Sequence, residues 1–250
     1  PVNRVLDLDG DGDAVRLPGD LLAGLEETTI EAWVRWERFG LYAQPIGLGR
    51  SWRGLFVNNK QRSGDLQFFA YLSAGHLELI HVSRILQLGR WHHLGAVITR
   101  QGLELYLDGV LVGARRIEGT LVTLGTGGEA LLGGTHWEGN EYFAGQIDEV
   151  RVWRRARTGD EIRADMHRRL TGSEAGLHAL YGFDEGDARD EGPGSFHGQM
   201  LGDARTIVEI LDERVVEAAP RVAWGSIRDE AGRTLSNVGV DLYCEGDVAR

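Results

Sequence analysis

The chain has 250 residues, a length that suits one large domain or one domain followed by a smaller fragment. Hydrophobic residues make up 42%, enough for a buried core, and the net charge of -11 argues against a nucleic-acid partner, because phosphate binding needs a basic surface. Cys244 is the single cysteine, so an intrachain disulfide is excluded. No apolar run approaches the roughly 20 residues of a membrane-spanning helix, so membrane insertion is not expected.

Short strands are predicted through the first half of the chain. Residues 28–36 alternate cleanly, and Asp108-Gly109 suits the positive φ angles of a type I′ hairpin turn. Strands at about ten-residue spacing predict an all-β sandwich or jelly roll. They are expected at residues 4–8, 14–17, 28–36, 46–49, 54–58, 66–72, 76–82 and 103–112.

The turn after the first strand is acidic, with Asp7, Asp9, Asp11 and Asp13 in alternation. An EF-hand is rejected, because Pro18 stands where that loop needs a bidentate glutamate and no helices flank it. Carboxylate oxygens are nevertheless the ligands that Ca²⁺ prefers, so Asp9 and Asp11 are candidate ligands of a structural calcium ion. The alternative is an ordinary solvated turn.

Trp91 is followed by two adjacent histidines, His92 and His93. Adjacent residues of a strand face opposite sides of the sheet, so this pair cannot chelate one metal ion together. Both are expected to have structural roles.

A Gly-rich loop at residues 133–142 is the best candidate for ligand binding. An aromatic ring on a loop offers a flat apolar face to a sugar, and amide and carboxylate groups orient its hydroxyls. Two residues of an earlier predicted loop would add an aromatic and cationic surface for an anionic glycan or a peptide carboxylate. The alternative is that these are ordinary variable loop residues. The candidate ligand-binding residues are Trp52, Arg53, His136, Trp137, Glu138 and Asn140.

Asp148 lies in a further predicted strand, residues 143–153. Strict alternation would place its carboxylate on the apolar face with Val150 and Val152. A buried carboxylate is costly unless it is hydrogen-bonded or holds a cation. Asp148 is therefore expected either to bind calcium or to be held by backbone N–H groups or an arginine.

One helix is predicted after this strand, at about residues 159–170. Thr158 and Glu161 match a capping box, in which each side chain accepts a hydrogen bond from the other residue's backbone N–H. Ile162, Met166 and Leu170 then recur at helical spacing and form an apolar stripe.

Several phrases of the sequence together resemble one family, the LamG-like branch of the concanavalin A-like jelly rolls. They begin at Trp91 (WHHLGAV), Leu105 (LYLDGVL), Phe143 (FAGQIDEVRVWRRAR) and Tyr181 (YGFDEG), in the family's order. The resemblance spans residues 4 to about 210. It implies two antiparallel sheets with one short helix.

The same resemblance bears on the site. Most such domains bind ligands and a few relatives cut glycans. The aspartate matching Asp148 holds a structural calcium ion in related glucanases, whereas Gln146 and Arg151 stand where their catalytic carboxylates would be, so no catalytic residue is expected. Residues 50–53 contain no carboxylate, which argues against a pentraxin-type double-calcium site.

Three regions are expected along the chain: a jelly-roll domain at residues 1–211, a linker at 212–220 and a partial β-module at 221–250. The last segment resembles the start of a carboxypeptidase-regulatory-like module. The chain opens at Pro1 without a signal peptide, as expected of a piece cut from a longer protein.

The sequence therefore predicts a non-catalytic recognition domain for a carbohydrate or a protein. We expect it to belong to a larger multidomain bacterial protein, such as a sensor or adhesin, in an extracytoplasmic location, with other domains of the same polypeptide as neighbours. The alternative is a structural or sensory spacer without a small ligand, and a glycoside hydrolase comes third.

Overall fold

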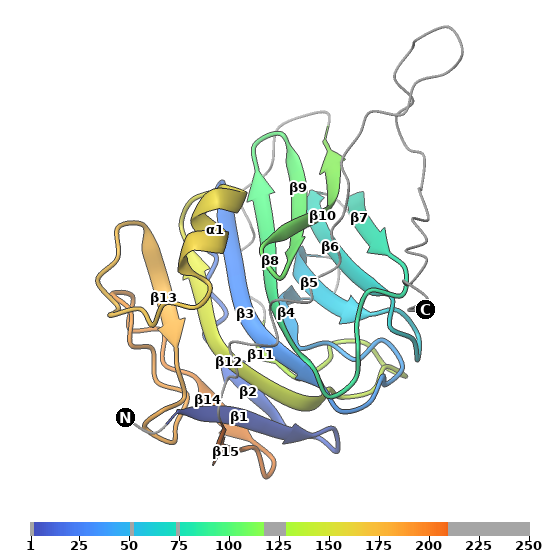
Figure 1. Ribbon diagram of the computed structural model, residues 1–250, viewed down its shortest axis with the longest axis vertical. Helices are drawn as coiled ribbons and strands as arrows, with labels where there is room; N and C mark the ends of the chain where they lie inside the picture. The colour runs from blue at the N-terminus through green and yellow to red at the C-terminus, as the bar shows by residue number, and fades with distance from the viewer. Residues whose placement is uncertain (1–2, 51–52, 74–75, 118–128, 210–250) are drawn as a thin grey trace, which may run out of the picture. The chain divides into compact units, whose positions relative to one another are not determined.

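The chain folds into a sandwich of two antiparallel sheets with one short helix, as the sequence predicts (Figure 1). The expected linker and C-terminal β-module, residues 212–250, lie outside the described residues. The computed structural model describes residues 3–50, 53–73, 76–117 and 129–209.

One sheet, here called sheet A, has eight strands. They are β1 (Arg4–Asp9), β3 (Thr28–Trp36), β8 (Trp91–Thr99), β9 (Gly102–Leu107), β10 (Val110–Arg116), β12 (Ala144–Trp153), β13 (Leu177–Tyr181) and β15 (Arg205–Val208). Their order is β10-β9-β8-β3-β12-β1-β15, and β13 pairs with the part of β12 that β1 leaves open. The β9–β10 hairpin turns at Asp108 and Gly109, with φ of 50° and 74°, as a type I′ turn requires.

The second sheet, sheet B, has seven strands. They are β2 (Ala14–Leu17), β4 (Ile46–Arg50), β5 (Arg53–Asn59), β6 (Leu66–Ser73), β7 (His76–Val82), β11 (Ala130–Leu132) and β14 (Gln199–Leu201). Their order is β14-β2-β11-β4-β5-β6-β7. The chain passes between the sheets repeatedly, so β1 and β2 belong to different sheets although they are consecutive.

The main core fills the space between the sheets. The alternating β3 segment sends Ile30, Val34 and Trp36 inward, and all three are fully buried. Leu55 and Val57 of β5 join the same core from sheet B. Since side chains alternate along a strand, Phe56, which lies between these two residues, faces outward from sheet B.

The helix α1 (Gly159–Asp165) begins at the predicted capping box. Thr158 Oγ1 accepts from the Glu161 N–H at 3.3 Å, and Glu161 Oε2 accepts from the Thr158 N–H at 2.8 Å. Ile162 packs with Val97 and Tyr106 against the outer face of sheet A. The helix ends earlier than residue 170, but Met166 and Leu170 remain buried beyond its end.

The predicted orientation of the Asp148 side chain is wrong, because β12 contains a β-bulge. The pairing with β3 shifts by one residue between Asp148 and Arg151, and Glu149 takes a φ of 49°. The extra residue puts Val150 and Val152 in the main core with Ile147, whereas Asp148 lies on the outer face of sheet A, paired with Trp33. Strict alternation fails at this bulge, which lies where β12 changes its neighbour from β1 to β13.

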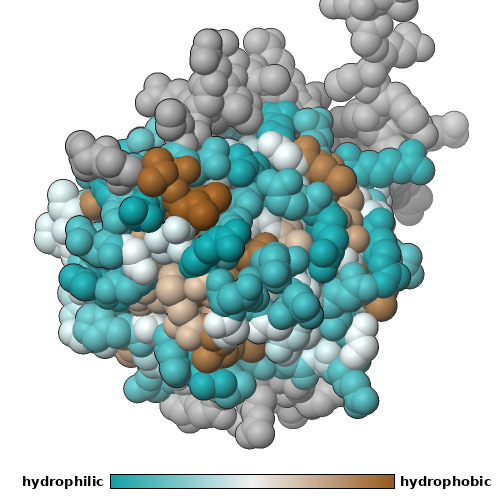
Figure 2. All heavy atoms as spheres, turned by 90° about the horizontal axis from the view of Figure 1, so that it is seen from below, coloured by the Kyte–Doolittle hydropathy of each residue, from teal (hydrophilic) through white to brown (hydrophobic). Residues whose placement is uncertain are grey.

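The surface seen from below carries small separated apolar patches among hydrophilic residues (Figure 2). This pattern agrees with the acidic composition and with ordinary protein surfaces, where scattered apolar residues need no special explanation.

Candidate functional site

The outer face of sheet B carries a cluster of aromatic rings, here called the aromatic platform. Phe56 of β5 and Phe69 of β6 are directly paired and stack with ring centroids 5.2 Å apart and an interplanar angle of 25°. Tyr71 continues the row, 6.1 Å from Phe69. The Trp137 ring meets Phe56 edge-on at 4.7 Å and lies 5.8 Å from Phe69. His136 completes the platform at 6.2 Å from Phe56.

The loop of residues 133–143 holds the last two of these rings in place. Its two ends are joined where the Phe143 N–H donates to the Gly133 carbonyl at 2.9 Å. Near its end, Glu141 accepts from the Leu41 N–H and donates its own N–H to the Leu41 carbonyl, both at 2.9 Å. The Trp137 N–H donates to Thr135 Oγ1 at 3.2 Å. A loop closed at its base and tied to a second loop presents its aromatic residues on a defined scaffold.

Amide side chains lie beside the rings. Asn58 and Gln67 are paired across β5 and β6, one row along from Phe56 and Phe69. Asn58 Oδ1 has no hydrogen-bond partner within the described part of the chain. Both residues are buried, Asn58 2% and Gln67 9% exposed, so their amides lie at the base of the platform and not on its open surface.

The apolar character of this face continues to the sheet edge. Leu79 pairs with Phe69 and Leu77 with Tyr71, and these leucines are 39% and 47% exposed. Burial raises the pKa of the Tyr71 hydroxyl, so it remains a neutral hydrogen-bonding group. Aromatic rings and exposed leucines in adjacent rows are characteristic of an interaction surface.

The structure brings together only part of the predicted ligand-binding set. His136 and Trp137 both join the platform, whereas Glu138 is exposed and Asn140 half-buried elsewhere on the same loop. Trp52 lies outside the described residues. Arg53 begins β5, and its side chain also lies outside the described part.

Sequence reasoning missed Phe56, Phe69 and Tyr71, which form most of the platform. Their strands were recognised, but outward-facing aromatic residues in a sandwich resemble core residues until the facing is known. The available signal was the alternation of Leu55 and Val57 with Phe56, which assigns one set to each face.

A carboxylate cluster forms at the acidic turn, but its membership differs from the prediction. Asp9, Asp13 and Asp203 each place one carboxylate oxygen so that the three oxygens lie within 4.8 Å of one another. Asp11 is not a member, and its N–H instead donates to Asp9 Oδ1 at 2.7 Å. Burial raises the pKa of Asp13 to about 6, and the nearby carboxylates of Asp203 and Asp9 add to this rise against the lowering effect of a hydrogen bond from the Asp9 backbone.

Asp148 is buried, 1% exposed, and its two oxygens are hydrogen-bonded. Oδ1 accepts from the Glu149 N–H at 2.8 Å, and Oδ2 accepts from Asn3 Nδ2 at 3.2 Å. Burial raises its pKa to about 8, the Glu149 charge raises it further, and the two hydrogen bonds lower it. Both oxygens of this carboxylate therefore accept hydrogen bonds from the protein, one of them from a backbone N–H.

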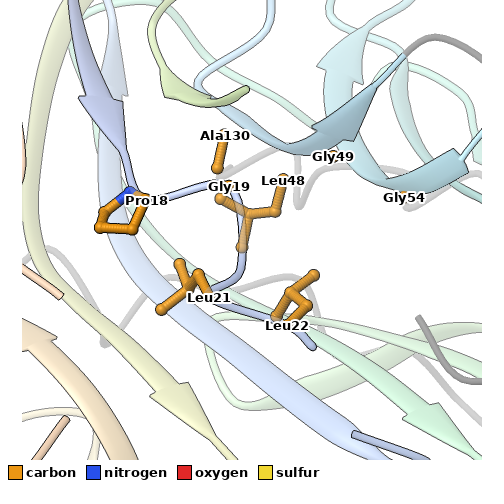
Figure 3. A pocket seen from close by; sticks show the side chains of 8 residues that line it. All are labelled: Pro18, Gly19, Leu21, Leu22, Leu48, Gly49, Gly54 and Ala130. Atoms are coloured by element: carbon orange, nitrogen blue, oxygen red, sulfur yellow. The ribbon is translucent and has the colours of Figure 1, made fainter. Parts of the chain in front are cut away.

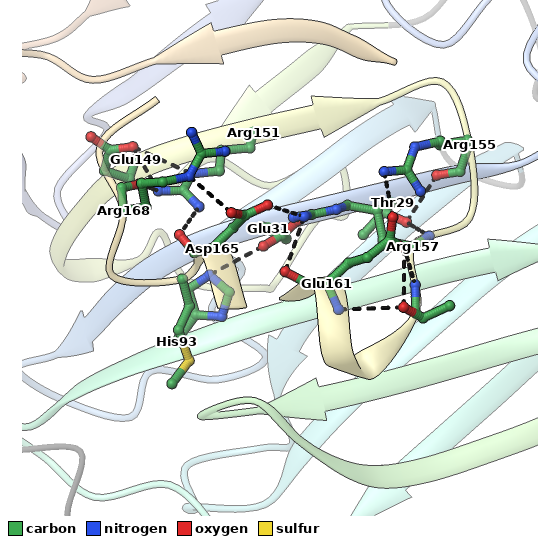
Figure 4. Close-up of polar contacts among 12 residues, drawn as sticks. Thr29, Glu31, His93, Glu149, Arg151, Arg155, Arg157, Glu161, Asp165 and Arg168 are labelled. Atoms are coloured by element: carbon green, nitrogen blue, oxygen red, sulfur yellow. Dashed lines mark hydrogen bonds and ion pairs between the residues drawn. The ribbon is translucent and has the colours of Figure 1, made fainter. Parts of the chain in front are cut away.

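The outer face of sheet A carries a buried ionic network, shown in Figure 4. Arg157 donates to Glu31 Oε1 at 2.6 Å and to the Glu161 carbonyl at 3.0 Å, and its guanidinium lies 4.2 Å from the Trp153 ring centroid. Arg151 donates to the backbone carbonyls of Asp165 and Arg168. Burial raises the pKa of Glu31 against the opposing charges of Arg157 and Arg151. The network fixes α1 and the chain after it to the sheet.

The two adjacent histidines have separate partners, as predicted. His92 Nδ1 lies 3.1 Å from Asp108 Oδ2, whereas His93 Nε2 lies 3.5 Å from Glu31 Oε2. Burial lowers the pKa of His93 well below its usual value. Both rings are buried, so their role is structural.

An apolar hollow lies under the β4–β5 hairpin, lined by Pro18, Leu21, Leu22 and the strand ends near Gly49 and Gly54 (Figure 3). It has room for about one water molecule and no charged group lines it. It therefore offers nothing that would orient a ligand.

Comparison with known proteins places these features in a family context. A family model for the concanavalin A-like lectin/glucanases superfamily matches residues 9–163. Pappalysin-1 from Mus musculus is 30% identical over 195 residues, which cover 71% of this chain and 12% of that protein. The chain thus spans about an eighth of this relative's length.

Solved structures show the same fold. A candidate carbohydrate-binding protein from Bacteroides ovatus aligns with a TM-score of 0.65 and 18% identity, covering 83% of this chain and 60% of that one. The heptameric SAP-like pentraxin from Limulus polyphemus aligns with a TM-score of 0.54 and 15% identity, covering 83% and 95%. Within the described residues, no helix is long and apolar enough to cross a membrane.

Proposed function

The chain belongs to the concanavalin A-like lectin/glucanases superfamily, and from that membership we propose that it is a non-catalytic recognition domain that binds a glycan on the aromatic platform. The observation that carries the proposal is the set of half-buried rings of Phe69, Tyr71 and Trp137 on an outward sheet face, packed on the fully buried ring of Phe56. Stacked rings of this kind supply flat apolar surface for sugar rings, at little cost in side-chain entropy.

Polar neighbours favour a glycan over a purely apolar ligand. Tyr71 carries a hydroxyl and His136 borders the rings on the loop side, both half-buried, while the amides of Asn58 and Gln67 are buried one row along. A sugar presents apolar C–H faces and hydroxyl edges together, which matches rings flanked by hydrogen-bonding groups. A protein ligand remains the second candidate, because Leu77 and Leu79 extend the apolar surface toward the strand edge.

Binding without cleavage is the chemistry that this face supports. Glycosidases need two carboxyl groups about 5–10 Å apart on either side of the scissile bond. The outward positions of β4 to β7 whose side chains the structure describes carry Gly, Phe, Asn, Gln, Tyr, Leu and His but no carboxylate. We therefore propose recognition instead of hydrolysis.

We also propose that the domain is one module of a larger extracytoplasmic protein, such as a bacterial sensor or adhesin. The support for a larger protein is the similarity of this chain to one short part of a much longer relative, Pappalysin-1, of which the match covers 12%. Calcium, if the domain holds it, would have a structural role, because the carboxylates that gather in the fold do not belong to the aromatic platform. The spacer alternative predicts no ligand at all.

A glycan array followed by calorimetry on the intact chain tests the proposal. Trp137→Ala is expected to weaken binding of a captured glycan by about 1–3 kcal/mol, the cost of removing an interface anchor. Phe69→Ala should weaken it in the same direction. Leu88→Ala is the matched control, since Leu88 is exposed but not part of the platform. Unchanged affinity in both aromatic variants would refute the site, and an array without any captured glycan would favour a protein ligand or the spacer role.

A further inference from the structure

The edge strand of sheet B carries a histidine beside the aromatic platform. β7 ends the strand order of this sheet and lies next to β6 (Figure 1). Its outward side chains Leu77, Leu79 and His81 are all exposed. Leu79 pairs with Phe69 of the platform, and His81 pairs with Gln67 in the next row. Successive rows on one face of a sheet are about 6–7 Å apart, so the histidine borders the apolar surface.

His81 is the polar group of this border that solvent can reach. The amides of Asn58 and Gln67, which share its row, are both buried. The half-buried Tyr71 belongs to the row on the other side of Phe69. Among the outward side chains of β4 to β7 that the structure describes, His81 is therefore the exposed one that can form hydrogen bonds with a ligand.

Asp65 holds the imidazole ring in place. His81 Nε2 lies 2.9 Å from Asp65 Oδ2, and Asp65 Oδ1 accepts from the Arg84 N–H at 2.9 Å. Burial raises the pKa of Asp65, but the hydrogen bonds from His81 and from the Arg84 backbone outweigh it, so the pKa is lowered and the carboxyl is ionised at neutral pH. An ionised carboxylate only accepts hydrogen bonds. Nε2 therefore carries a hydrogen, and Nδ1 is the nitrogen left for another partner.

We propose that His81, oriented by Asp65, is a specificity-determining residue of the aromatic platform that forms a hydrogen bond through Nδ1 with a hydroxyl of the stacked glycan. The inference rests on the proposed glycan binding. Within the described residues no hydrogen bond involves this Nδ1, and the side chain is 30% exposed. A hydroxyl both donates and accepts, so it can pair with Nδ1 whether or not the ring is protonated. A ring already fixed by a carboxylate loses little freedom when a ligand binds.

The contact would make the platform selective instead of merely adhesive. Aromatic rings stack on many sugars, whereas a fixed hydrogen-bonding group disfavours an analogue that lacks the matching hydroxyl. Because His81 is partly exposed, water can replace a missing hydroxyl. The expected discrimination is therefore about three- to tenfold, the range of one net hydrogen bond.

Calorimetry on the intact chain tests the proposal. The probe is the oligosaccharide that the parent chain binds most tightly among an array of glucose, galactose, mannose and xylose oligomers, together with its monodeoxy analogues. His81→Ala is expected to weaken binding of this probe by about three- to tenfold. One monodeoxy analogue should weaken binding to the parent chain by the same factor and bind His81→Ala as well as the full probe does. Such a double-mutant cycle isolates the contact between the histidine and that hydroxyl.

Two further variants separate orientation from general effects. In Asp65→Asn a single amide oxygen replaces two carboxylate oxygens, so it cannot serve both the Arg84 N–H and His81 Nε2 in the same way. Binding of the probe should weaken in the same direction as in His81→Ala, but less. His167→Ala is the matched control, since this exposed histidine lies beside Trp33 on the outer face of sheet A.

Three results would overturn the proposal. Unchanged affinity in His81→Ala, while Trp137→Ala still weakens binding, removes the role of His81 and leaves the platform as the binding site. A loss in His81→Ala that is equal for the probe and for every monodeoxy analogue, or that His167→Ala shares, shows a general effect and no contact with one hydroxyl. If no oligomer of the array binds the parent chain, the proposed glycan binding fails and this inference fails with it.

Discussion

The outer faces of the two sheets have opposite chemistry. On sheet A, Glu31, Arg151 and Arg157 are buried beneath α1 and the chain that follows it. On sheet B, Phe69, Tyr71 and Trp137 are only half-buried, and no described helix lies over them. The charged face is closed by the protein's own backbone, whereas the aromatic face keeps part of its ring surface exposed among the described residues.

This difference shows why the more polar face is the less plausible binding site. The buried cations of sheet A, Arg151 and Arg157, are paired with carboxylates and backbone carbonyls beneath α1 and the chain after it, so a ligand would have to displace α1. The rings of sheet B contact one another, and the leucines beside them remain exposed among the described residues. Perturbed pKa values cluster at functional sites, but structural ion networks perturb them too, and Glu31 and His93 belong to the second kind.

The largest expected effect comes from breaking the network of sheet A. Arg157→Met removes the cation that neutralises Glu31, and a buried charge left without its partner typically costs about 3–5 kcal/mol of unfolding free energy. Urea denaturation measures this cost. Arg155→Met is the control, because its pair with Glu161 is 39% exposed on the arginine side and should contribute less than about 1 kcal/mol. Equal costs for the two variants would show that the network is no more than a surface ion pair.

A smaller effect is expected at the bulge, where the outer face of sheet A holds Asp148. With a pKa of about 8 in the native state against 3.8 for a free aspartate side chain, Asp148 keeps its proton in the folded protein over a range in which the unfolded chain has lost it. The native state therefore binds more protons between about pH 4 and 8, and stability falls as pH rises through that window.

Asp148→Asn removes the titrating group but keeps an oxygen that can accept from the Glu149 N–H. It should be more stable than the parent by roughly 1–3 kcal/mol at pH 9, with little gain near pH 4. Asp148→Ala should instead lose about 1–3 kcal/mol near pH 4, because it strands the buried hydrogen-bond donors. Unfolding free energies measured from pH 4 to 9 check both, with Asp187→Asn as a solvent-accessible control. A parent pH profile unchanged by Asp148→Asn would mean that Asp148 is ionised throughout.

Loosening α1 itself should cost less again. Thr158→Ala removes the N-terminal cap of the helix and is expected to destabilise the fold by about 1 kcal/mol. Thr158→Ser keeps the hydroxyl and should retain most of that stability. The ionic network of sheet A also holds the helix, so α1 should stay in place in Thr158→Ala and glycan binding on sheet B should not change. A loss of glycan affinity in this variant would show that the two faces are coupled.

The sequence predicted the fold because period-2 alternation, the Asp108-Gly109 turn and the Thr158 capping box are local signals. Residues 28–36 show the point, since each inward residue can be assigned from its neighbours alone. The site was harder to predict because it is assembled by tertiary contacts. Asp203 reaches Asp13 from 190 positions along the chain, and no local pattern marks it. The bulge at Glu149 lies where β12 changes its neighbouring strand, and alternation along the sequence does not mark that point.

The smallest effect on stability should come from the edge of the aromatic face. Leu79→Ser replaces a leucine that is 39% exposed and belongs to no buried cluster, so the unfolding free energy should change by no more than about 0.5 kcal/mol. Leu79 is nevertheless paired with Phe69, and a ligand long enough to reach β7 would contact it. Affinity for a long glycan should therefore fall in Leu79→Ser while affinity for a short one does not, and Leu88→Ser should change neither. Calorimetry with oligosaccharides of increasing length measures this dependence. If Leu79→Ser destabilises the fold as much as Thr158→Ala does, the outer face of sheet B is part of the folded core and the distinction between a closed and an open face fails.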